Sequence, residues 1–457
     1  MAGLSNSRRA AHAVLSVARE RDAYVRELLN SPACADILGR LSEEDRAFAR
    51  RLCLGVTATS GVLDELVDRY VARPERLDPE VRDVLRLATY EMAFLGKSPH
   101  AAVSQGVELV KTCAKSASGL VNAVLRRVSE NVDAFMGESA AHRFGLPAWL
   151  LDRVAAQLGD DAADAFGRAY LEPAPVFVAN VPMWVSDKRA QEAFAEAGLA
   201  VRAAGSVPGS WVADDPAAVP SCQLVKENQA VVADYGAQAV AFLAAPEPGD
   251  RLLEVGSGRG TKTVLMAGHT HRQGGAARVW ALDVHEYKAR LAERRLEEAR
   301  VAGVVQVTGD ACDLSGLASL PPLFDRILVD APCTGTGTLR RRPEIAWSLS
   351  PDDVASCAAL QLAMLRSVAP RLAAGGVLSY ATCSVLREED EDVVAAFLAS
   401  PEGAGFEIVP VERVAASCDA SAGDELAERS CPEGFMRTVP APGECDGHFC
   451  ACLVKRG

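Results

Sequence analysis

The sequence predicts a multidomain protein with an all-α N-terminal bundle, a small α/β connecting subdomain and a C-terminal doubly wound domain with a seven-stranded, mostly parallel sheet. Up to about residue 138, apolar residues recur at helical spacing and no strand pattern interrupts them. From about residue 246, short apolar runs alternate with amphipathic segments, which is typical of parallel strands joined by helices. Mixed patterns lie between these regions. We therefore expect domains at 1–138, 139–245 and 246–457.

The N-terminal region contains several helical segments. Residues 10–18 and 46–54 carry apolar side chains at helical spacing. Ser42 precedes three acidic residues, which is typical of an N-cap followed by a first helical turn. Residues 81–95 form a further amphipathic segment that ends near a glycine and a proline, and residues 120–128 form another. Together these segments predict a helical bundle.

The middle region combines one helix, one strand and a loop-rich stretch. Residues 147–171 have a helical pattern that ends at a Glu-Pro-Ala-Pro sequence. Residues 176–181 are a short apolar run typical of a strand. Proline, glycine and aspartate cluster between 205 and 221, which predicts loops. This composition predicts the small α/β connecting subdomain.

The C-terminal region has seven candidate strands with amphipathic segments between most of them. The predicted strands are 251–255, 278–283, 304–308, 325–330, 375–381, 406–411 and 449–454. The predicted helices between them include 286–301, 352–373 and 386–399.

Composition and charge exclude several classes of protein. The chain has 457 residues and a net charge of -13, which argues against a generic nucleic-acid binder but not against a local basic patch. Residues 340–342 are three consecutive arginines and form such a patch. No apolar run reaches the ~20 residues of a membrane span, and no signal-peptide pattern occurs. We expect a cytoplasmic protein without membrane attachment.

The thirteen cysteines have no disulfide-framework spacing, so reduced thiols in a reducing compartment are expected. Four of them lie near His448, at 431, 445, 450 and 452, but their spacing matches no zinc site well. We therefore expect no metal. Motifs of zinc peptidases and serine hydrolases are also missing from the sequence.

A glycine-rich turn follows the first predicted strand of the C-terminal domain. Its glycines permit positive φ and a close approach of the backbone to a ligand. The pattern departs from the dinucleotide fingerprint and resembles a phosphate-binding P-loop more closely, although Thr261 replaces the glycine before the lysine. A nucleotide hydrolase therefore remains an alternative. The third interpretation is an S-adenosylmethionine site formed by Gly256, Ser257, Gly258, Arg259, Gly260, Thr261 and Lys262.

Three aspartates at the ends of successive predicted strands favour the S-adenosylmethionine interpretation. Asp283 ends the second strand, close to the spacing of ~20 residues beyond the glycine turn at which a carboxylate accepts ribose hydroxyl groups. Asp310 ends the third strand and is positioned to accept the adenine amino group. Asp330 ends the fourth strand. A single such aspartate is commonly a turn residue, but three in succession indicate a site.

Two cysteines, Cys333 and Cys383, are placed at the ends of two further apolar runs. The carboxyl ends of strands are where an open α/β sheet binds ligands. Acidic residues after Cys383 are typical of a first helical turn, and a helix N-terminus lowers a thiol pKa. Two thiols beside an acid indicate covalent chemistry on an electrophilic ring. A thiolate that adds to carbon-6 of cytosine makes carbon-5 nucleophilic toward a methyl donor, and an acid near N3 lowers the barrier.

Three motifs resemble the NOL1/NOP2/Sun family of RNA cytosine-5 methyltransferases, of the Sun/Fmu type that acts on 16S rRNA. The motifs are residues 330–337 (Asp-Ala-Pro-Cys-Thr-Gly-Thr-Gly), the arginine-rich residues 339–347 and residues 381–384 (Ala-Thr-Cys-Ser). The N-terminal helical region, residues 120–126 above all, resembles the NusB-type RNA-binding domain. The resemblance spans nearly the whole chain and includes residues 446–449.

The resemblance implies roles for individual residues. Cys383 would be the nucleophile and Cys333 would assist product release, while Asp330 would contact the target base or the cofactor. Residues 256–262, Asp283 and Asp310 would bind S-adenosylmethionine in a Rossmann-like domain. Small-subunit ribosomal RNA would be the substrate, and we expect a monomer. A non-catalytic RNA-binding or assembly protein with the same fold is the remaining alternative.

Departures from the family pattern lie mainly in the glycine turn. The family sequence Cys-Ala-Ala-Pro-Gly-Gly-Lys is replaced by residues 256–262, in which only Gly260 and Lys262 match. The family's Arg-Val-Asn before the catalytic domain is replaced by Val-Ala-Asn at residues 178–180.

Overall fold

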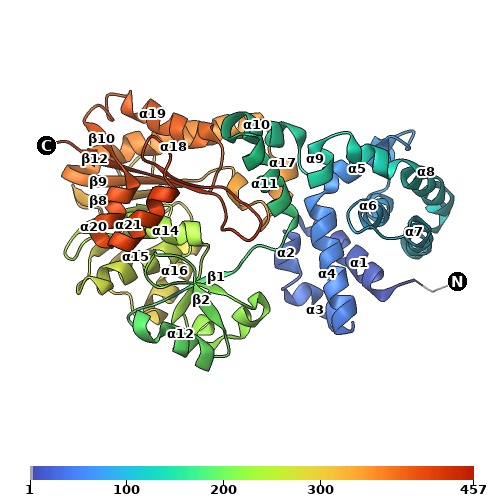
Figure 1. Cartoon of the computed structure of the whole chain (residues 1–457), viewed down its shortest axis with the longest axis horizontal. Coiled ribbons are helices and arrows are strands. Elements are labelled where there is room, and N and C mark those ends of the chain that lie inside the picture. Colours follow the sequence, from blue (N-terminus) through green and yellow to red (C-terminus); the bar gives the residue numbers. More distant parts are fainter. Residues whose placement is uncertain (1–3) are drawn as a thin grey trace. The chain divides into compact units, whose positions relative to one another are not determined.

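The computed structural model describes residues 4–457 and contains two compact units (Figure 1). The first unit comprises Met1–Pro173 together with Leu339–Ser348, and the second comprises Ala174–Thr338 with Leu349–Gly457. The chain therefore leaves the second unit for a short excursion and returns to it. The first division falls after Pro173, inside the predicted connecting subdomain, so the three-domain division stays a prediction.

The first unit is helical, as the sequence predicts. Its α-helices are α1 (Asn6–Arg21), α2 (Val25–Leu28), α3 (Pro32–Gly39), α4 (Glu43–Ala58), α5 (Ser60–Asp68), α6 (Pro79–Ala93), α7 (Pro99–Cys113), α8 (Ser118–Gly137), α9 (Ala140–Phe144), α10 (Ala148–Leu158), α11 (Asp160–Leu171) and α17 (Glu344–Ser348). The short 3₁₀ helices η1 (Pro74–Arg76) and η2 (Lys115–Ala117) also belong to this unit.

Local signals explain where these helices begin and end. The Ser42 side chain accepts a hydrogen bond from the backbone N–H of Asp45 at 3.2 Å, which confirms the predicted N-cap of α4. The predicted helix 147–171 is instead two helices, because Gly159 has φ +92° and breaks the pattern between α10 and α11. Fully buried leucines such as Leu52, Leu85 and Leu125 form the core that joins α4, α6 and α8.

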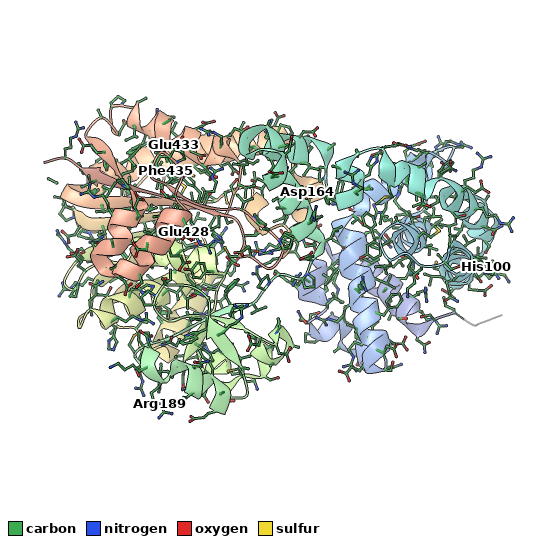
Figure 2. The ribbon with its side chains drawn as sticks, in the orientation of Figure 1. His100, Asp164, Arg189, Glu428, Glu433 and Phe435 are labelled. Atoms are coloured by element: carbon green, nitrogen blue, oxygen red, sulfur yellow. The ribbon has the colours of Figure 1, made fainter. Side chains whose placement is uncertain are left out.

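The second unit begins with a small antiparallel sheet. Its strand order is β2-β3-β1-β4, with β1 (Phe177–Asn180), β2 (Val201–Ala203), β3 (Ser210–Ala213) and β4 (Ala230–Val232). Its helical segments are α12 (Asp187–Glu196), η3 (Pro216–Ser221), α13 (Gln223–Lys226) and α14 (Tyr235–Leu243). Arg189 on α12 lies on the outer surface of this unit (Figure 2).

The larger sheet of the second unit has the order β10-β12-β9-β8-β5-β6-β7, and β11 pairs with β12 at its side. Its strands are β5 (Arg251–Val255), β6 (Arg278–Asp283), β7 (Val304–Thr308), β8 (Phe324–Asp330), β9 (Leu372–Thr382), β10 (Phe406–Val409), β11 (Met436–Thr438) and β12 (His448–Lys455). The five strands from β7 to β9 pair in parallel, whereas β10, β11 and β12 pair antiparallel. The seven predicted strands are confirmed, and β11 is an additional short strand that the sequence analysis missed.

Helices cover both faces of this sheet (Figure 1). They are α15 (Thr261–Arg272), α16 (Glu286–Glu298), α18 (Pro351–Val368), α19 (Glu391–Leu398), α20 (Val411–Cys418) and α21 (Ala420–Glu428), with 3₁₀ turns η4 (Thr336–Thr338), η5 (Ala369–Arg371) and η6 (Arg387–Glu389).

Successive side chains of a strand point to opposite faces of the sheet. Leu252 packs in the cluster that contains α14, α15 and α21, while its neighbour Leu253 packs in the cluster that contains α18 and α19. Phe435, labelled in Figure 2, lies just before β11. Its ring packs edge-on against that of Phe449 of β12, with ring centroids 5.3 Å apart. Within residues 4–457, none of the helices has the length and apolar character that crossing a bilayer requires.

Candidate active site

The carboxyl ends of the parallel strands gather five residues that the sequence singles out. Asp283 is the last residue of β6 and Asp330 is the last of β8, while Gly256 follows β5, Cys383 follows β9 and Asp310 lies two residues after β7. Because these strands are parallel, all five positions meet at one edge of the sheet. The predicted placement of these residues at the sheet edge is confirmed.

The glycine turn after β5 requires glycine for steric reasons. Gly256 has φ +81°, and a Cβ atom there would lie 2.2 Å from the backbone oxygen of Asp330. Gly258 and Gly260 also have positive φ, and Gly260 precedes the first turn of α15. The glycines therefore let β5 and β8 approach closely and leave room beside the strand ends.

Asp283 is held in place by the glycine turn itself. Its two carboxylate oxygens accept backbone N–H groups, Oδ2 from Gly258 at 3.0 Å and Oδ1 from His285 at 2.8 Å. An ionised carboxylate has about four acceptor positions, so two remain for the hydroxyl groups of a ligand. Asp310 is more exposed, and its Oδ1 accepts the backbone N–H of Cys312 at 2.8 Å.

A cavity of about 390 Å³ lies along this edge. This volume is within the range of ~300–1,000 Å³ typical of small-molecule sites. Polar groups come from the strand ends and apolar groups from α18, and the lining includes Gly256, Asp283, Asp310, Asp330, Pro332, Leu360 and Met364. Such a lining combines a hydrogen-bonding end with an apolar surface suited to a flat ring.

Two buried polar atoms near the glycine turn are without a hydrogen-bond partner among residues 4–457, namely Oε1 of Glu254 and Oγ of Ser257. Burial raises the pKa of Glu254 to about 8, against the opposing effect of the hydrogen bond from Thr263. The methionine part of S-adenosylmethionine carries an ammonium group and a carboxylate, but neither Glu254 nor Ser257 is among the residues that line the cavity. With the free acceptor positions of Asp283 and the size of the cavity, the residues present fit this cofactor.

The two cysteines at the sheet edge are in direct contact. The sulfur atoms of Cys333 and Cys383 lie 3.3 Å apart, both residues are half-buried, and neither is in a disulfide. The hydrogen bond from Cys333 lowers the pKa of Cys383, and the Lys262 ammonium lowers it further against the effect of burial. The same hydrogen bond and burial raise the pKa of Cys333. The two shifts have opposite signs, so Cys383 is the more acidic thiol of the pair.

Lys262 and Asp330 form an ion pair beside these thiols. Nζ of Lys262 lies 2.7 Å from Oδ2 of Asp330, and both side chains are largely shielded from solvent. Burial is the largest single influence and lowers the pKa of Lys262, but Asp330, Cys383 and Glu254 together raise it, so the net shift is upward. The ammonium group therefore stays charged close to the Cys383 sulfur.

A buried glutamate connects the two cysteine-bearing loops. Glu389 is fully buried, and its carboxylate accepts the backbone N–H of Thr334 at 2.8 Å and the Ser384 hydroxyl at 2.7 Å. The Thr334 hydroxyl and the Gln361 side-chain amide also donate to it. Four donors satisfy the four acceptor positions of one carboxylate. Since Thr334 follows Cys333 and Ser384 follows Cys383, Glu389 sets the separation of the two thiols.

A second buried acid supports the strand end that precedes Cys383. Oδ1 of Asp390 accepts the Thr382 hydroxyl at 2.6 Å, and Arg437 of β11 pairs with Oδ2 at 3.3 Å. Burial raises the pKa of Asp390 well above its ordinary value, although Arg437 opposes this shift. The contact anchors the end of β9 to β11.

The predicted helix 386–399 is present as α19, but it does not begin directly after Cys383, so the expected helix N-terminus beside this thiol was wrong. The chain passes through the 3₁₀ turn η6, and α19 begins only at Glu391. Glu389 and Asp390 are buried acceptors rather than solvated first-turn acids. The pKa of Cys383 is lowered by Cys333 and Lys262, not by a helix N-terminus.

The predicted cofactor loop lies only partly on the cavity. Gly256 and Gly258 line it, whereas Ser257, Arg259, Gly260, Thr261 and Lys262 are not among its lining residues. The Thr261 hydroxyl instead accepts a hydrogen bond from Arg295 at 2.5 Å, and Lys262 reaches Asp330. Contacts of these five residues with a cofactor stay a prediction.

Glu389 and Gln361 were missed by the sequence analysis. Glu389 stands in a run of five acids, which is the pattern of an exposed helix start, and Gln361 lies within an amphipathic helix. No local signal distinguishes them, because their burial follows from how η6 and α18 pack together.

Comparisons with known proteins agree with this geometry. A model of the family described as 16S rRNA methyltransferase RsmB/F matches residues 241–454, and a model of the NusB family matches residues 5–130. The chain is 37% identical to ribosomal RNA small subunit methyltransferase B of Thermus thermophilus over 78% of its own length and 79% of that protein. It is 30% identical to the protein of the same name from Klebsiella pneumoniae over 91% of its length and 92% of that protein.

Solved structures support the same fold. The crystal structure of PH0851 has a TM-score of 0.75 at 20% identity and covers the whole of both chains. A methyltransferase homologue from Pyrococcus horikoshii has a TM-score of 0.56 at 22% identity and covers 69% of this chain and 97% of its own. The strand ends, the cavity and these relatives lead to one conclusion: the chain belongs to the RsmB/F family of 16S rRNA methyltransferases, with a NusB-type helical domain at its N-terminus.

Proposed function

We propose that this chain methylates carbon-5 of a cytosine in 16S ribosomal RNA, with S-adenosylmethionine as methyl donor and a covalent bond between Cys383 and carbon-6 of the base. The observation that carries this proposal is the 3.3 Å contact between the Cys333 and Cys383 sulfurs at the edge of the cavity, beside the Lys262–Asp330 ion pair. A methyltransferase that acts on an oxygen or an exocyclic nitrogen needs no thiol at this place.

The cofactor is assigned to the cavity at the strand ends. Asp283 would hold the ribose hydroxyl groups and Asp310 the adenine amino group, with Leu360 and Met364 against the ring. When bound, the cofactor supplies the methyl group as an electrophile to carbon-5 of the base.

Cys383 is the attacking group. Its thiolate forms a bond to carbon-6, and the electron pair of the carbon-5–carbon-6 double bond moves toward carbon-5 and the ring nitrogen N3. The Lys262–Asp330 pair offers a proton and a positive charge beside the thiol, and it offsets the negative charge that develops on the ring. The base then reacts at carbon-5.

Cys333 serves the last step. After methylation the carbon-5 proton leaves to water, the carbon-6–sulfur bond breaks, and its electron pair returns to Cys383 as a thiolate. The Cys333 S–H group donates a hydrogen bond to that sulfur, which stabilises the departing thiolate. The difference in pKa between the two thiols therefore supports attack by Cys383 and release assisted by Cys333.

The reaction is tested by mapping 5-methylcytosine. Unmethylated 16S rRNA from a strain that lacks this protein is incubated with the purified chain and S-adenosylmethionine, and the product is sequenced after bisulfite treatment. We expect one protected cytosine that disappears in Cys383→Ala. Methyl transfer to another atom, or full activity of Cys383→Ala, would contradict the proposal.

Detecting a covalent protein–RNA adduct in cysteine variants distinguishes the roles of the two thiols. Cys333→Ala should accumulate a protein–RNA species that survives denaturing electrophoresis, because attack continues while release slows. The double variant Cys333→Ala/Cys383→Ala should form none. Normal turnover of Cys333→Ala without an adduct would remove Cys333 from the mechanism. The cytoplasmic location and the monomeric state stay predictions.

A further inference from the structure

The segment Leu339–Ser348, which contains the three arginines, belongs to the first unit (Figure 1). Nε1 of Trp347 and the Tyr170 hydroxyl both donate to the backbone oxygen of Ala58, each at 2.6 Å. The Trp347 ring also lies against Gly61, where a Cβ atom would meet it at 2.1 Å. The segment is thus seated on α4, α5 and α11 and does not form an open loop.

This seating creates a pocket of about 230 Å³ between α2 and the segment. Its lining consists of Tyr24, Arg26, Glu27, Arg341, Arg342 and Glu344. Arg26 donates to the backbone oxygen of Arg340 at 3.2 Å, which ties α2 to the segment. Three guanidinium groups and two carboxylates therefore line the pocket. The pocket is smaller than the ~300–1,000 Å³ of drug-sized sites, so its size suits no more than a single nucleotide.

Tyr24 and Glu344 offer a ligand an exposed aromatic ring and a hydrogen-bond acceptor. The Tyr24 ring is 45% exposed, and an exposed aromatic ring among arginines is the arrangement on which unpaired bases stack. The Glu344 carboxylate accepts the backbone N–H of Val25 through Oε1 at 2.9 Å, while Oε2 is buried without a hydrogen-bond partner among residues 4–457. A buried acceptor without a donor is costly unless a ligand supplies one.

We propose that the Tyr24–Glu344 pocket binds one unpaired nucleotide of the RNA substrate, outside the site of methylation. The base stacks on Tyr24, its exocyclic amino group donates to Oε2 of Glu344, and its phosphate pairs with Arg342. Cytosine, adenine and guanine carry such an amino group and uracil does not, so the pocket prefers the first three. This inference rests on the proposed function only in taking RNA as the substrate.

The test measures binding of fluorescently labelled oligocytidylate and oligouridylate to the full chain by fluorescence anisotropy at several salt concentrations. Tyr24→Ala should weaken oligocytidylate binding roughly tenfold, the effect of losing one stacked base. Arg342→Ala should weaken binding to both oligonucleotides and reduce the slope of log affinity against log salt by about one. Glu344→Gln should lose the preference for oligocytidylate over oligouridylate.

The matched control is Arg76→Ala, which removes an exposed guanidinium of the same unit that does not line the pocket. Thermal unfolding and S-adenosylmethionine binding verify that each variant is folded. If Tyr24→Ala and Arg342→Ala bind like the control, or if Glu344→Gln keeps the preference of the unmodified chain, the pocket does not bind RNA.

Methylation kinetics separate this inference from the proposed reaction. With 16S rRNA as substrate, Tyr24→Ala should raise KM for RNA roughly tenfold and leave kcat unchanged, because the pocket holds the RNA away from the reacting base. A loss of kcat at unchanged KM would overturn the inference. If the unmodified chain methylates no cytosine, the proposed function fails, and the oligonucleotide affinities still decide whether the pocket binds RNA.

Discussion

At the scale of single residues, the two thiols differ because their surroundings differ. Both lie at the same sheet edge with their sulfurs 3.3 Å apart, yet the pKa of Cys383 is lowered, with the Lys262 ammonium contributing, whereas burial helps to raise the pKa of Cys333. Cys383 therefore loses its proton more readily than Cys333. Removing either neighbour of Cys383 should change its reactivity in a predictable direction.

We predict that Cys333→Ala raises the pKa of Cys383, because the thiolate loses its hydrogen-bond donor. The rate at which iodoacetamide alkylates Cys383, measured by mass spectrometry of its peptide across pH, should shift to higher pH. Cys418→Ala removes an exposed cysteine of the same unit and serves as the control. An unshifted profile in Cys333→Ala would show that the contact between the sulfurs does not tune Cys383.

Glu389→Gln should loosen the pair of thiols. The amide group supplies one acceptor oxygen where the carboxylate served four donors, so we expect a loss of about 1–3 kcal/mol in the free energy of unfolding. We also expect slower formation of a disulfide between Cys333 and Cys383 under a mild oxidant, which measures how well the sulfurs are aligned. Glu407→Gln, at a half-exposed position of β10, is the control. A stable variant with unchanged disulfide formation would argue against a positioning role.

At the scale of elements, the glycine turn after β5 decides how closely two strands and a ligand approach. Three positive-φ glycines let the chain reverse between β5 and α15, and the absence of a side chain at Gly256 leaves space for the backbone of Asp330. Thr261 departs from the family pattern, and its hydroxyl accepts a hydrogen bond from Arg295 of α16. The turn is therefore supported from outside the cavity in this chain.

Gly256→Ala should destabilise the second unit and abolish S-adenosylmethionine binding. The left-handed conformation costs a non-glycine residue about 1–2 kcal/mol, and the contact with the Asp330 oxygen adds to that cost. Gly249→Ala carries only the conformational cost, because Gly249 has φ +93° and a Cβ atom there would meet nothing within 4 Å. The difference between the two variants therefore measures the contact with Asp330. Equal loss of stability in both variants, measured by urea unfolding, would mean that the close approach at Gly256 is unimportant.

At the scale of the whole molecule, stability depends on pH through groups that the fold buries. His269 of α15 is buried, and burial lowers its pKa from 6.5 to about 3, with Arg272 contributing in the same direction. Above pH 6.5 both the folded and the unfolded states hold it neutral. Between about pH 6.5 and pH 3 only the unfolded state takes up the proton, so stability falls as the pH falls.

His269→Leu should flatten this dependence. One proton taken up only by the unfolded state changes the free energy of unfolding by at most about 1.4 kcal/mol per pH unit. Urea unfolding at several pH values between 6.5 and 3 should give a smaller slope for the variant by up to that amount. His271→Leu, at an exposed position of the same helix, should keep the slope of the unmodified chain. If the free energy of unfolding of His269→Leu depends on pH as strongly as that of the unmodified chain, the buried carboxylates and not His269 cause the loss of stability in acid.

Much of the fold was predictable because its signals are local. The runs 251–255, 278–283 and 304–308 coincide with β5, β6 and β7. The central strand β5 is buried along most of its length and therefore needs a continuous apolar run, whereas the edge strand β7 is marked by its valines. β11 was missed because three residues are too few to form a pattern. The break at Gly159 was missed because a single glycine is also tolerated within a helix.

The sequence by itself determined seven strands of the larger sheet, their mostly parallel arrangement and the positions of the aspartates and cysteines near strand ends, since short-range periodicity and turn chemistry encode them. Only the tertiary structure decided that Cys333 and Cys383 touch, that Glu389 joins their loops and that Leu339–Ser348 belongs to the helical unit. The physical reason is distance along the chain: these contacts join residues far apart in sequence, and burial turns acids that look solvated into acceptors held by four donors.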